Sequence, residues 1–337
     1  MSSVPGRPRR PYFPAMRPFP ALALLAIVTA TGCVTRQSVT RSLTELPAGT
    51  EAVSLFNEPF QAPPLPGATK ARLEADLASA RAVVAAHPDS VLALIWVGRR
   101  LGYLGRFQEA IATFSEGIEK WPKDPRLLRF RGHRYISVRN FEGAVVDLER
   151  ARVLVRGTSD DVEPDGAPNP RGIPTSTLHS NIRYHLFLAY YLLGNFRAAA
   201  EIQREDLDAK PNLDTRVATS YWHVMTLRRL GRDNEAHRIL EGITPEMVVI
   251  ENHSYHRLLM LFKGRVTTDS LLARAPDPAS ALDEATYGNG VGVYHLLADR
   301  PDSAVAAFRR ARATGPWAAF GAIAAEAELR RLGVAVR

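Results

Sequence analysis

The chain has 337 residues, of which 46% are hydrophobic and 23% charged, enough apolar sequence for one elongated or two compact globular domains and too much for wholesale disorder. The formal net charge is +8 at pH 7, but four arginines and no acidic residue precede Cys33. Because this N-terminal segment supplies half of the excess, the charge is weak evidence for nucleic-acid binding, and no nucleic-acid partner is predicted.

The first predicted element is an export signal over residues 1–32. Arginines precede an apolar run at 21–30, which is too short to span a bilayer as a mature helix. Three small residues then come directly before Cys33. This pattern resembles the lipobox of bacterial lipoproteins, and the resemblance implies cleavage of the signal and acylation of Cys33. Met1 and Met16 each precede a complete signal, so the start of translation is left open.

A lipid at Cys33 would attach the chain to the membrane of the bacterial cell envelope. Val34 follows Cys33 in place of an aspartate retention signal, which predicts an outer-membrane anchor with the chain facing the periplasm. Cys33 is also the only cysteine, so no intramolecular disulfide forms. Residues 33–67 are rich in Pro, Thr, Ser and Gly, a composition that predicts a tether with little regular structure.

Helical patterning begins near residue 68, and the segment 97–118 is similar to 131–152 at an offset of 34 residues. The matched pairs include Gly98 and Gly132, Phe107 and Phe141, and Ala110 and Ala144. This spacing, with these residue types, resembles the tetratricopeptide repeat (TPR). The resemblance implies an all-α fold, a right-handed superhelix (α-solenoid) of about six helix pairs over residues 68–333.

Further repeat units follow with decreasing similarity, at 184–202, 221–240, 252–275 and 291–313. Amphipathic helices at 71–88 and 316–333 are predicted to cover the two ends of the array. The chain as a whole resembles bacterial TPR lipoproteins without an assigned role, which implies a location and a fold but no chemistry.

The repeat is interrupted at residues 156–177, where prolines, glycines and acidic residues make a helix unfavourable. An insertion of this length in a solenoid is either a surface loop or a lid over the binding groove, and both interpretations stay open. Its acidic residues Asp160, Asp161, Glu163 and Asp165 do not follow the calcium-loop pattern, so solvated charge is the preferred interpretation.

In TPR proteins that bind ligands, set positions of each first helix line the concave face of the array. Carried over by repeat register, these positions predict partner contacts at Arg126, Arg129, His133, Asn181, Tyr184, His185, Tyr221 and Arg228. Arginine pairs with carboxylates and tyrosine adds contact area with a polar tip. The predicted partner is therefore a protein or an extended peptide with acidic groups or a terminal carboxylate.

The sequence contains no phosphate-binding loop, no GxSxG and no HExxH motif. No catalytic residue, metal ligand or cofactor is predicted, and a non-enzymatic scaffold is favoured while the enzyme question stays open. The alternative is a metal-dependent or acid–base enzyme formed by the 156–179 loop with His133, His179 and His185. A third possibility is a structural spacer without any ligand.

Overall fold

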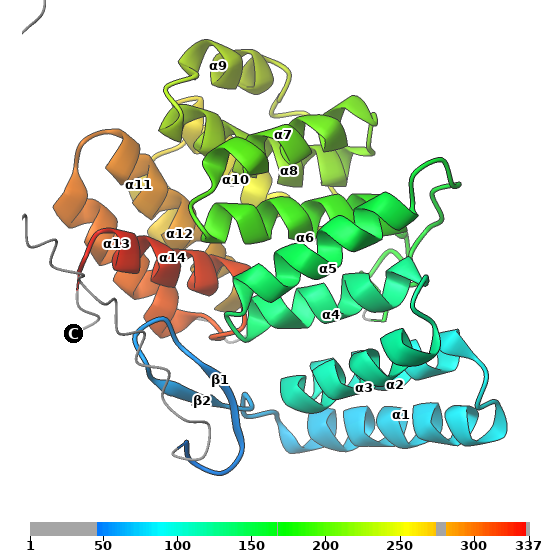
Figure 1. Cartoon of the computed structure of the whole chain (residues 1–337). Helices are drawn as coiled ribbons and strands as arrows, with labels where there is room; N and C mark the ends of the chain where they lie inside the picture. The colour runs from blue at the N-terminus through cyan, green and yellow to red at the C-terminus, as the bar shows by residue number, and fades with distance from the viewer. Residues whose placement is uncertain (1–45, 167, 274–280, 335–337) are drawn as a thin grey trace, which may run out of the picture. The chain divides into compact units, whose positions relative to one another are not determined.

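The computed structural model describes residues 46–166, 168–273 and 281–334. The predicted signal peptide (1–32) and Cys33 lie outside the described residues, so the predictions for them stay predictions. In the described residues, two short strands come before a long series of helices (Figure 1). None of these helices combines the length and the apolar character that a membrane crossing requires.

The elements are β1 (Thr50–Val53), β2 (Pro59–Gln61), α1 (Gly67–Ala86), α2 (Val91–Tyr103), α3 (Phe107–Lys120), α4 (Pro125–Ser137), α5 (Phe141–Leu154), α6 (Leu178–Leu192), α7 (Phe196–Asp208), α8 (Leu213–Arg229), α9 (Asp233–Glu241), α10 (His253–Phe262), α11 (Thr268–Leu272), α12 (Ala281–Leu297), α13 (Pro301–Thr314) and α14 (Phe320–Arg331). Consecutive helices pack in pairs: α2 with α3, α4 with α5, α6 with α7, α8 with α9, and α12 with α13. Helix α11 packs against α12, and α10 against α8 and α12, so the unit predicted at 252–275 is the irregular one. The all-α fold of repeated helix pairs is confirmed.

One packing contact recurs in the first two pairs, 34 residues apart. A Cβ atom at Gly98 would lie 2.4 Å from the ring of Phe114, and one at Gly132 would lie 2.7 Å from the side chain of Leu148. Phe114 and Leu148 are both fully buried. Only glycine lets the two helices of each pair approach this closely, so the sequence repeat reflects a repeated contact. These pairs are TPR-like repeats.

We expect Gly132→Val to lower the free energy of unfolding by about 1–3 kcal/mol, because the added methyl groups must displace Leu148 in a packed core. Denaturant unfolding followed by circular dichroism measures this loss. The control is Gly67→Val in the first turn of α1, where a Cβ atom meets nothing within 4 Å. The control should change stability by less than about 1 kcal/mol. Unchanged stability of the Gly132 variant would contradict the shared contact.

The turn inside each pair needs a residue with positive φ. Gly105 supplies it after α2 with φ 76° and Gly194 after α6 with φ 79°. After α4 the same position holds Arg139, with φ 68°. A non-glycine residue there costs about 1–3 kcal/mol of backbone strain. Arg139 is held there by its buried side chain, which donates to the carbonyl of Ser137 at 2.7 Å and to Glu326 at 2.9 Å.

The structure differs from the predicted tether over residues 33–67, because strands β1 and β2 pair as an antiparallel hairpin within that range. The ring of Phe60 stacks on Trp317, with 5.0 Å between centroids. Trp317 also donates its indole N–H to the carbonyl of Gln61 at 2.9 Å. This stretch is therefore ordered against the C-terminal part of the chain. The strands are too short for a periodic pattern to reveal them, and Trp317, against which they pack, is far away in sequence.

Helix α14 also differs from the prediction of an amphipathic end cover over 316–333. Every residue from Gly321 to Leu329 is buried, and the helix packs against α6, α12 and α13. A helix that is buried on all sides belongs to the interior. Its carboxylates Glu326 and Glu328 are each paired with arginines. Consequently, α14 fills space beside α6 that an open array would leave as groove.

Candidate functional site

A cavity of about 550 Å³ lies between α2, α4, the start of α6 and the loop of residues 156–177, which we call the lid loop. Its wall combines basic, aromatic and small polar side chains. The lining residues are Gly98, Arg99, Gly102, Tyr103, Phe114, Arg129, Phe130, His133, Arg134, Glu163, Pro164, Asp165, Pro174, Thr175, Ser176, Asn181, Glu251 and Leu282. The volume is sufficient for a small ligand or for one or two residues of a peptide.

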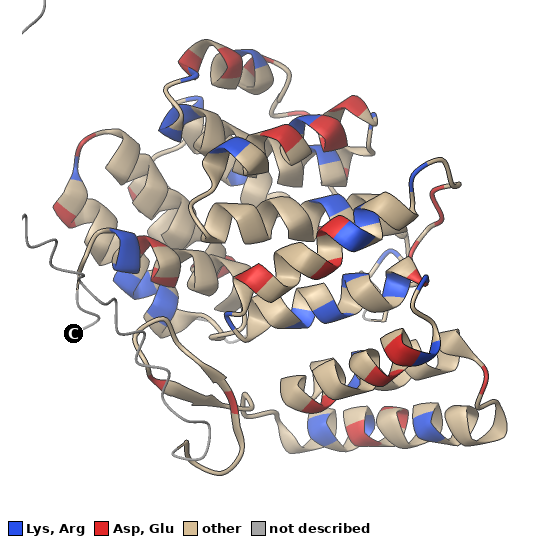
Figure 2. Cartoon of the chain, viewed as in Figure 1, with Lys and Arg blue, Asp and Glu red and all other residues tan. Residues whose placement is uncertain are grey.

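Three arginines give the cavity its chemical character. Arg129 and Arg134 lie on α4, a helix with several basic positions (Figure 2), and Arg99 lies on α2. Aromatic faces orient them: the guanidinium carbon of Arg99 is 4.3 Å from the ring centroid of Trp96, and that of Arg129 is 4.4 Å from that of Phe130. Stacking of this kind fixes planar guanidinium groups while leaving their N–H donors available.

The three arginines differ in whether a carboxylate neutralises their charge. Arg129 forms a buried ion pair with Glu163 of the lid loop at 2.9 Å. Arg99 donates to two neutral oxygens, the carbonyl of Pro164 at 2.7 Å and the hydroxyl of Tyr103 at 3.3 Å. In the part of the chain that the structure describes, no carboxylate pairs with Arg134. Its burial, next to Arg129 and Arg99, lowers the pKa of Arg134 to about 9.

Two histidines lie behind the arginines. The ring centroids of His133 and His185 are 4.4 Å apart, and Phe320 of α14 packs against both rings. Burial, reinforced by neighbouring arginines, holds the pKa of each histidine well below its usual value of 6.5. Both rings are therefore neutral at pH 7, and each has one N–H donor and one acceptor nitrogen.

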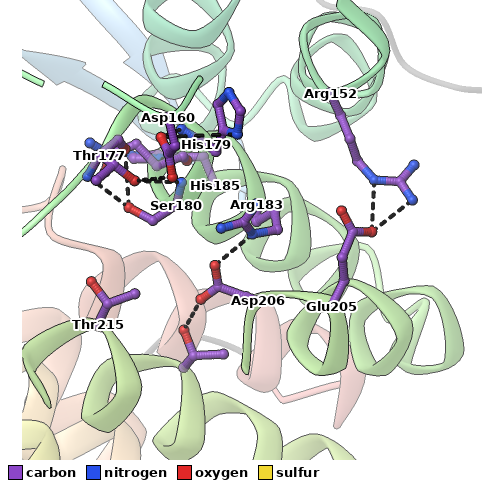
Figure 3. A network of polar contacts seen from close by, with 12 residues as sticks. Arg152, Asp160, Thr177, His179, Ser180, Arg183, His185, Glu205, Asp206 and Thr215 are labelled. Atoms are coloured by element: carbon purple, nitrogen blue, oxygen red, sulfur yellow. Dashed lines mark hydrogen bonds and ion pairs between the residues drawn. The ribbon is translucent and has the colours of Figure 1, made fainter. Parts of the chain in front are cut away.

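The lid loop is fixed at its C-terminal base, where α6 begins. The carboxylate of Asp160 accepts from the Thr177 hydroxyl at 2.8 Å and from the backbone N–H of His179 at 2.9 Å (Figure 3). Thr177 and Ser180 form a capping box that starts α6. Figure 3 also shows the neighbouring Arg152–Glu205 and Arg183–Asp206 ion pairs.

Glu251 holds the middle of the lid loop from the connection between α9 and α10. It accepts from the amide of Asn169 at 2.7 Å and from the hydroxyl of Thr175 at 2.5 Å. The backbone carbonyl of Thr175 accepts in turn from Asn212 at 2.8 Å. Of the two interpretations left open by the sequence, surface loop or lid, the contacts support the lid, because the loop forms one wall of the cavity.

Glu251→Ala should make the lid loop open more often. Losing about 1 kcal/mol of hydrogen bonding raises the open population about fivefold, and protease cleavage rises with it. Limited trypsin digestion measures cleavage after the exposed Arg171. Glu246→Ala, at an exposed site in the same connection, is the control and should cleave at the original rate. Equal rates for both variants would contradict the role of Glu251.

The predicted partner contacts fall into two groups. Arg129, His133 and Asn181 line the cavity. The other five do not: Arg126 pairs with Asp124, Arg228 pairs with Asp233, His185 is buried behind the wall, Tyr184 bonds to Tyr255, and Tyr221 is fully buried beside Asn289. His185 and Tyr221 are buried because Phe320 of α14 and Asn289 of α12 lie against them, in space that an open groove would leave to a partner.

Several residues of the site were missed by register alone. Arg134 follows His133 and lies over Gly102, where a Cβ atom would be 2.9 Å from its guanidinium nitrogen. Composition predicts solvated charge at Glu163, whereas the structure pairs its carboxylate with Arg129. The signal in the sequence that could have identified Arg134 is a basic residue in one repeat that faces a glycine, Gly102, in the repeat before it.

The three histidines of the alternative enzyme site do not all lie together. His133 and His185 are in contact, whereas His179 turns to Thr158, with 3.1 Å between its Nε2 atom and the hydroxyl oxygen. Within 46–166, 168–273 and 281–334, no group of three or more His, Cys, Asp or Glu side chains is placed to hold a metal ion.

Comparisons with known proteins give only distant similarities. No family model matches the chain, and no curated protein matches it. Among solved structures, a tetratricopeptide repeat protein from Parabacteroides merdae is 17% identical, with a TM-score of 0.47 over 77% of this chain and 93% of that chain. YrrB, described as a TPR protein with an unusual peptide-binding site, is 13% identical, with a TM-score of 0.39 over 72% and 95%.

The class of protein follows from the chain's own helix pairs and their 34-residue contact repeat. It is an all-α repeat protein with TPR-like pairs, whose cavity is lined by arginines and covered by the lid loop.

Proposed function

We propose that the protein is a scaffold that binds a partner protein or peptide through an anionic group, which enters the arginine-lined cavity. The observation that carries this proposal is a pair of cations at the wall of a cavity, Arg99 and Arg134, for which the described residues show no ion pair with a carboxylate. Keeping such charges together without counter-charge costs stability. A bound anion would remove that cost.

The chain contains an example of the proposed chemistry. The Glu163 carboxylate lies on Arg129 inside the cavity wall, so this environment accommodates a carboxylate on a guanidinium. Next to it, Thr175, Ser176 and Asn181 add small polar groups to the lining. Such groups suit the backbone of a peptide better than an apolar ligand. The partner contacts are thus expected at Arg99, Arg134, His133 and Asn181.

Fluorescence anisotropy with the full chain tests the proposal. A labelled glutamate-rich peptide should bind at least about tenfold more tightly than its glutamine twin of equal length. The difference should shrink at high salt, because part of the attraction is screened. Equal affinities for the two peptides would contradict an anion-binding role.

We further propose that the scaffold is anchored by a lipid at Cys33 in the bacterial envelope, in the outer membrane and facing the periplasm. The support is the lipobox-like sequence before Cys33 and the valine after it. Expression of Cys33→Ala tests this, with membrane fractionation and incorporation of labelled palmitate. The variant should lose the label and leave the membrane fraction, and a variant that stays membrane-bound would contradict the anchor.

A further inference from the structure

The imidazole of His133 lies between two guanidinium groups, and it cannot accept a hydrogen bond from both of them. Its Nδ1 atom is 3.4 Å from a guanidinium nitrogen of Arg129, and its Nε2 atom is 2.5 Å from one of Arg134. Guanidinium nitrogens only donate, and a neutral imidazole has a single acceptor nitrogen. In one of the two contacts, therefore, the N–H of the imidazole faces an N–H of a guanidinium group. An anion oxygen placed there would accept from both groups.

The charges around His133 leave an excess of two positive charges. Arg129 and Arg134 face it from its own helix, and Arg99 faces it from α2, where Arg99 also donates to the hydroxyl of Tyr103. From α6 and α14, the neutral ring of His185 and the apolar ring of Phe320 pack against it. The lid loop contributes one carboxylate, Glu163.

Two further acids, Asp165 and Glu251, also line the cavity, but both are exposed, and Glu251 is engaged by Asn169 and Thr175. They screen the arginines less than a buried carboxylate would. Inside the wall, Arg129 keeps its Nε atom, and Glu163 its Oε2 atom, without a hydrogen-bond partner among the described residues.

We propose that the group bound in this cavity is a tetrahedral dianion, the phosphate monoester of a phosphorylated partner peptide, and that His133 takes up a proton when it binds. This inference rests on the proposed anion-binding function. Two negative charges balance the excess on Arg99 and Arg134. Three donor side chains, counting His133, suit the three free oxygens of a monoester better than the two of a carboxylate. The proton comes from solvent, and no covalent bond changes.

Proton uptake follows from the same electrostatics. In the free protein, burial and the arginines hold the pKa of His133 well below 6.5. A bound dianion offsets the arginines and raises that pKa, so the complex carries a proton that the free site lacks. Affinity must then rise as pH falls through the pKa of the complex.

Calorimetry with the full chain compares the affinities of sulfate and methanesulfonate, and so separates the effect of charge from that of shape. Both ions are tetrahedral, but sulfate carries two negative charges and methanesulfonate one. Sulfate should bind about tenfold more tightly, and Arg134→Gln should abolish the difference while Arg134→Lys restores part of it. Equal affinity of the two ions would overturn the dianion. If glutamate-rich peptides still bind, the proposed function survives that result.

A second experiment tests the source of the phosphate group. A phosphoserine peptide should bind more tightly than inorganic phosphate, and equal affinity would overturn a peptide-borne group.

The role of His133 is tested by the pH dependence of sulfate binding. Sulfate does not titrate between pH 5 and pH 8, so any pH dependence of its binding comes from the protein. His133→Gln should remove that dependence and the proton uptake seen between buffers of different ionisation enthalpy. Retention of both in this variant would overturn the role of His133.

Discussion

Replacing Glu326 with alanine should destabilise the folded chain by about 3–5 kcal/mol, the usual cost of removing one partner from a buried ion pair. Glu326 is 1% exposed and lies in α14, where Arg139 donates to it at 2.9 Å. It also accepts from the backbone N–H of Leu55 at 2.6 Å. Without it, a buried guanidinium and a backbone donor lose their partner together. Denaturant unfolding measures the loss.

Two further variants make the Glu326 prediction specific. Glu116→Ala, at an exposed position of α3, should change stability by less than about 0.5 kcal/mol. Arg139→Gly should cost less than Glu326→Ala, because glycine removes the strain of φ 68° and Arg312 remains 3.9 Å from Glu326. If Glu326→Ala is as stable as the Glu116 variant, the ion pair between α14 and Arg139 in the α4–α5 turn does not stabilise the fold.

Replacing Arg134 with glutamine should weaken binding of a glutamate-rich peptide by about 10- to 100-fold, since a charge-assisted hydrogen bond in a partly buried site contributes about 1.5–3 kcal/mol. The same variant should be as stable as the original chain or more so. It removes a cation of the cavity wall that pairs with no carboxylate of the described residues, and desolvation together with Arg129 lowers its pKa to about 9. A residue kept only for structure would show the opposite, lost stability with unchanged binding.

Arg228→Gln is the matched control for Arg134→Gln. Both side chains are arginines, and the sequence predicts a partner contact at Arg228, but Arg228 pairs with Asp233 outside the cavity. Its replacement should leave peptide binding within about twofold of the original, as expected for an exposed ion pair. Equal effects of the two replacements on binding would mean that general positive charge, rather than the cavity, attracts the peptide.

The repeat could be predicted from sequence because its signal is local. Gly98 and Gly132 face Phe114 and Leu148 across a single helix pair, so the contact recurs within each window of 34 residues. The interior position of α14 could not be predicted in this way. Its carboxylate Glu326 meets Arg139 from 187 residues away, and no periodic pattern encodes a pairing at that distance.

Repeat register predicts the position of a side chain where no element outside the repeat covers it. Arg129 and His133 lie on the cavity wall, as the register of α4 implies. Tyr221 is covered, because α8 is buried along most of its length, whereas its position would be open in a regular array. Glu163 was assigned to solvated charge because composition alone cannot show that a loop folds back onto Arg129.

A crystal structure of the full chain with a bound acidic peptide would show whether an anionic group of the partner sits between Arg99 and Arg134 under the lid loop. We expect a carboxylate or phosphate of the peptide within hydrogen-bond distance of both guanidinium groups. A peptide bound on another face, with the cavity left free of its acidic groups, would contradict anion binding at this site.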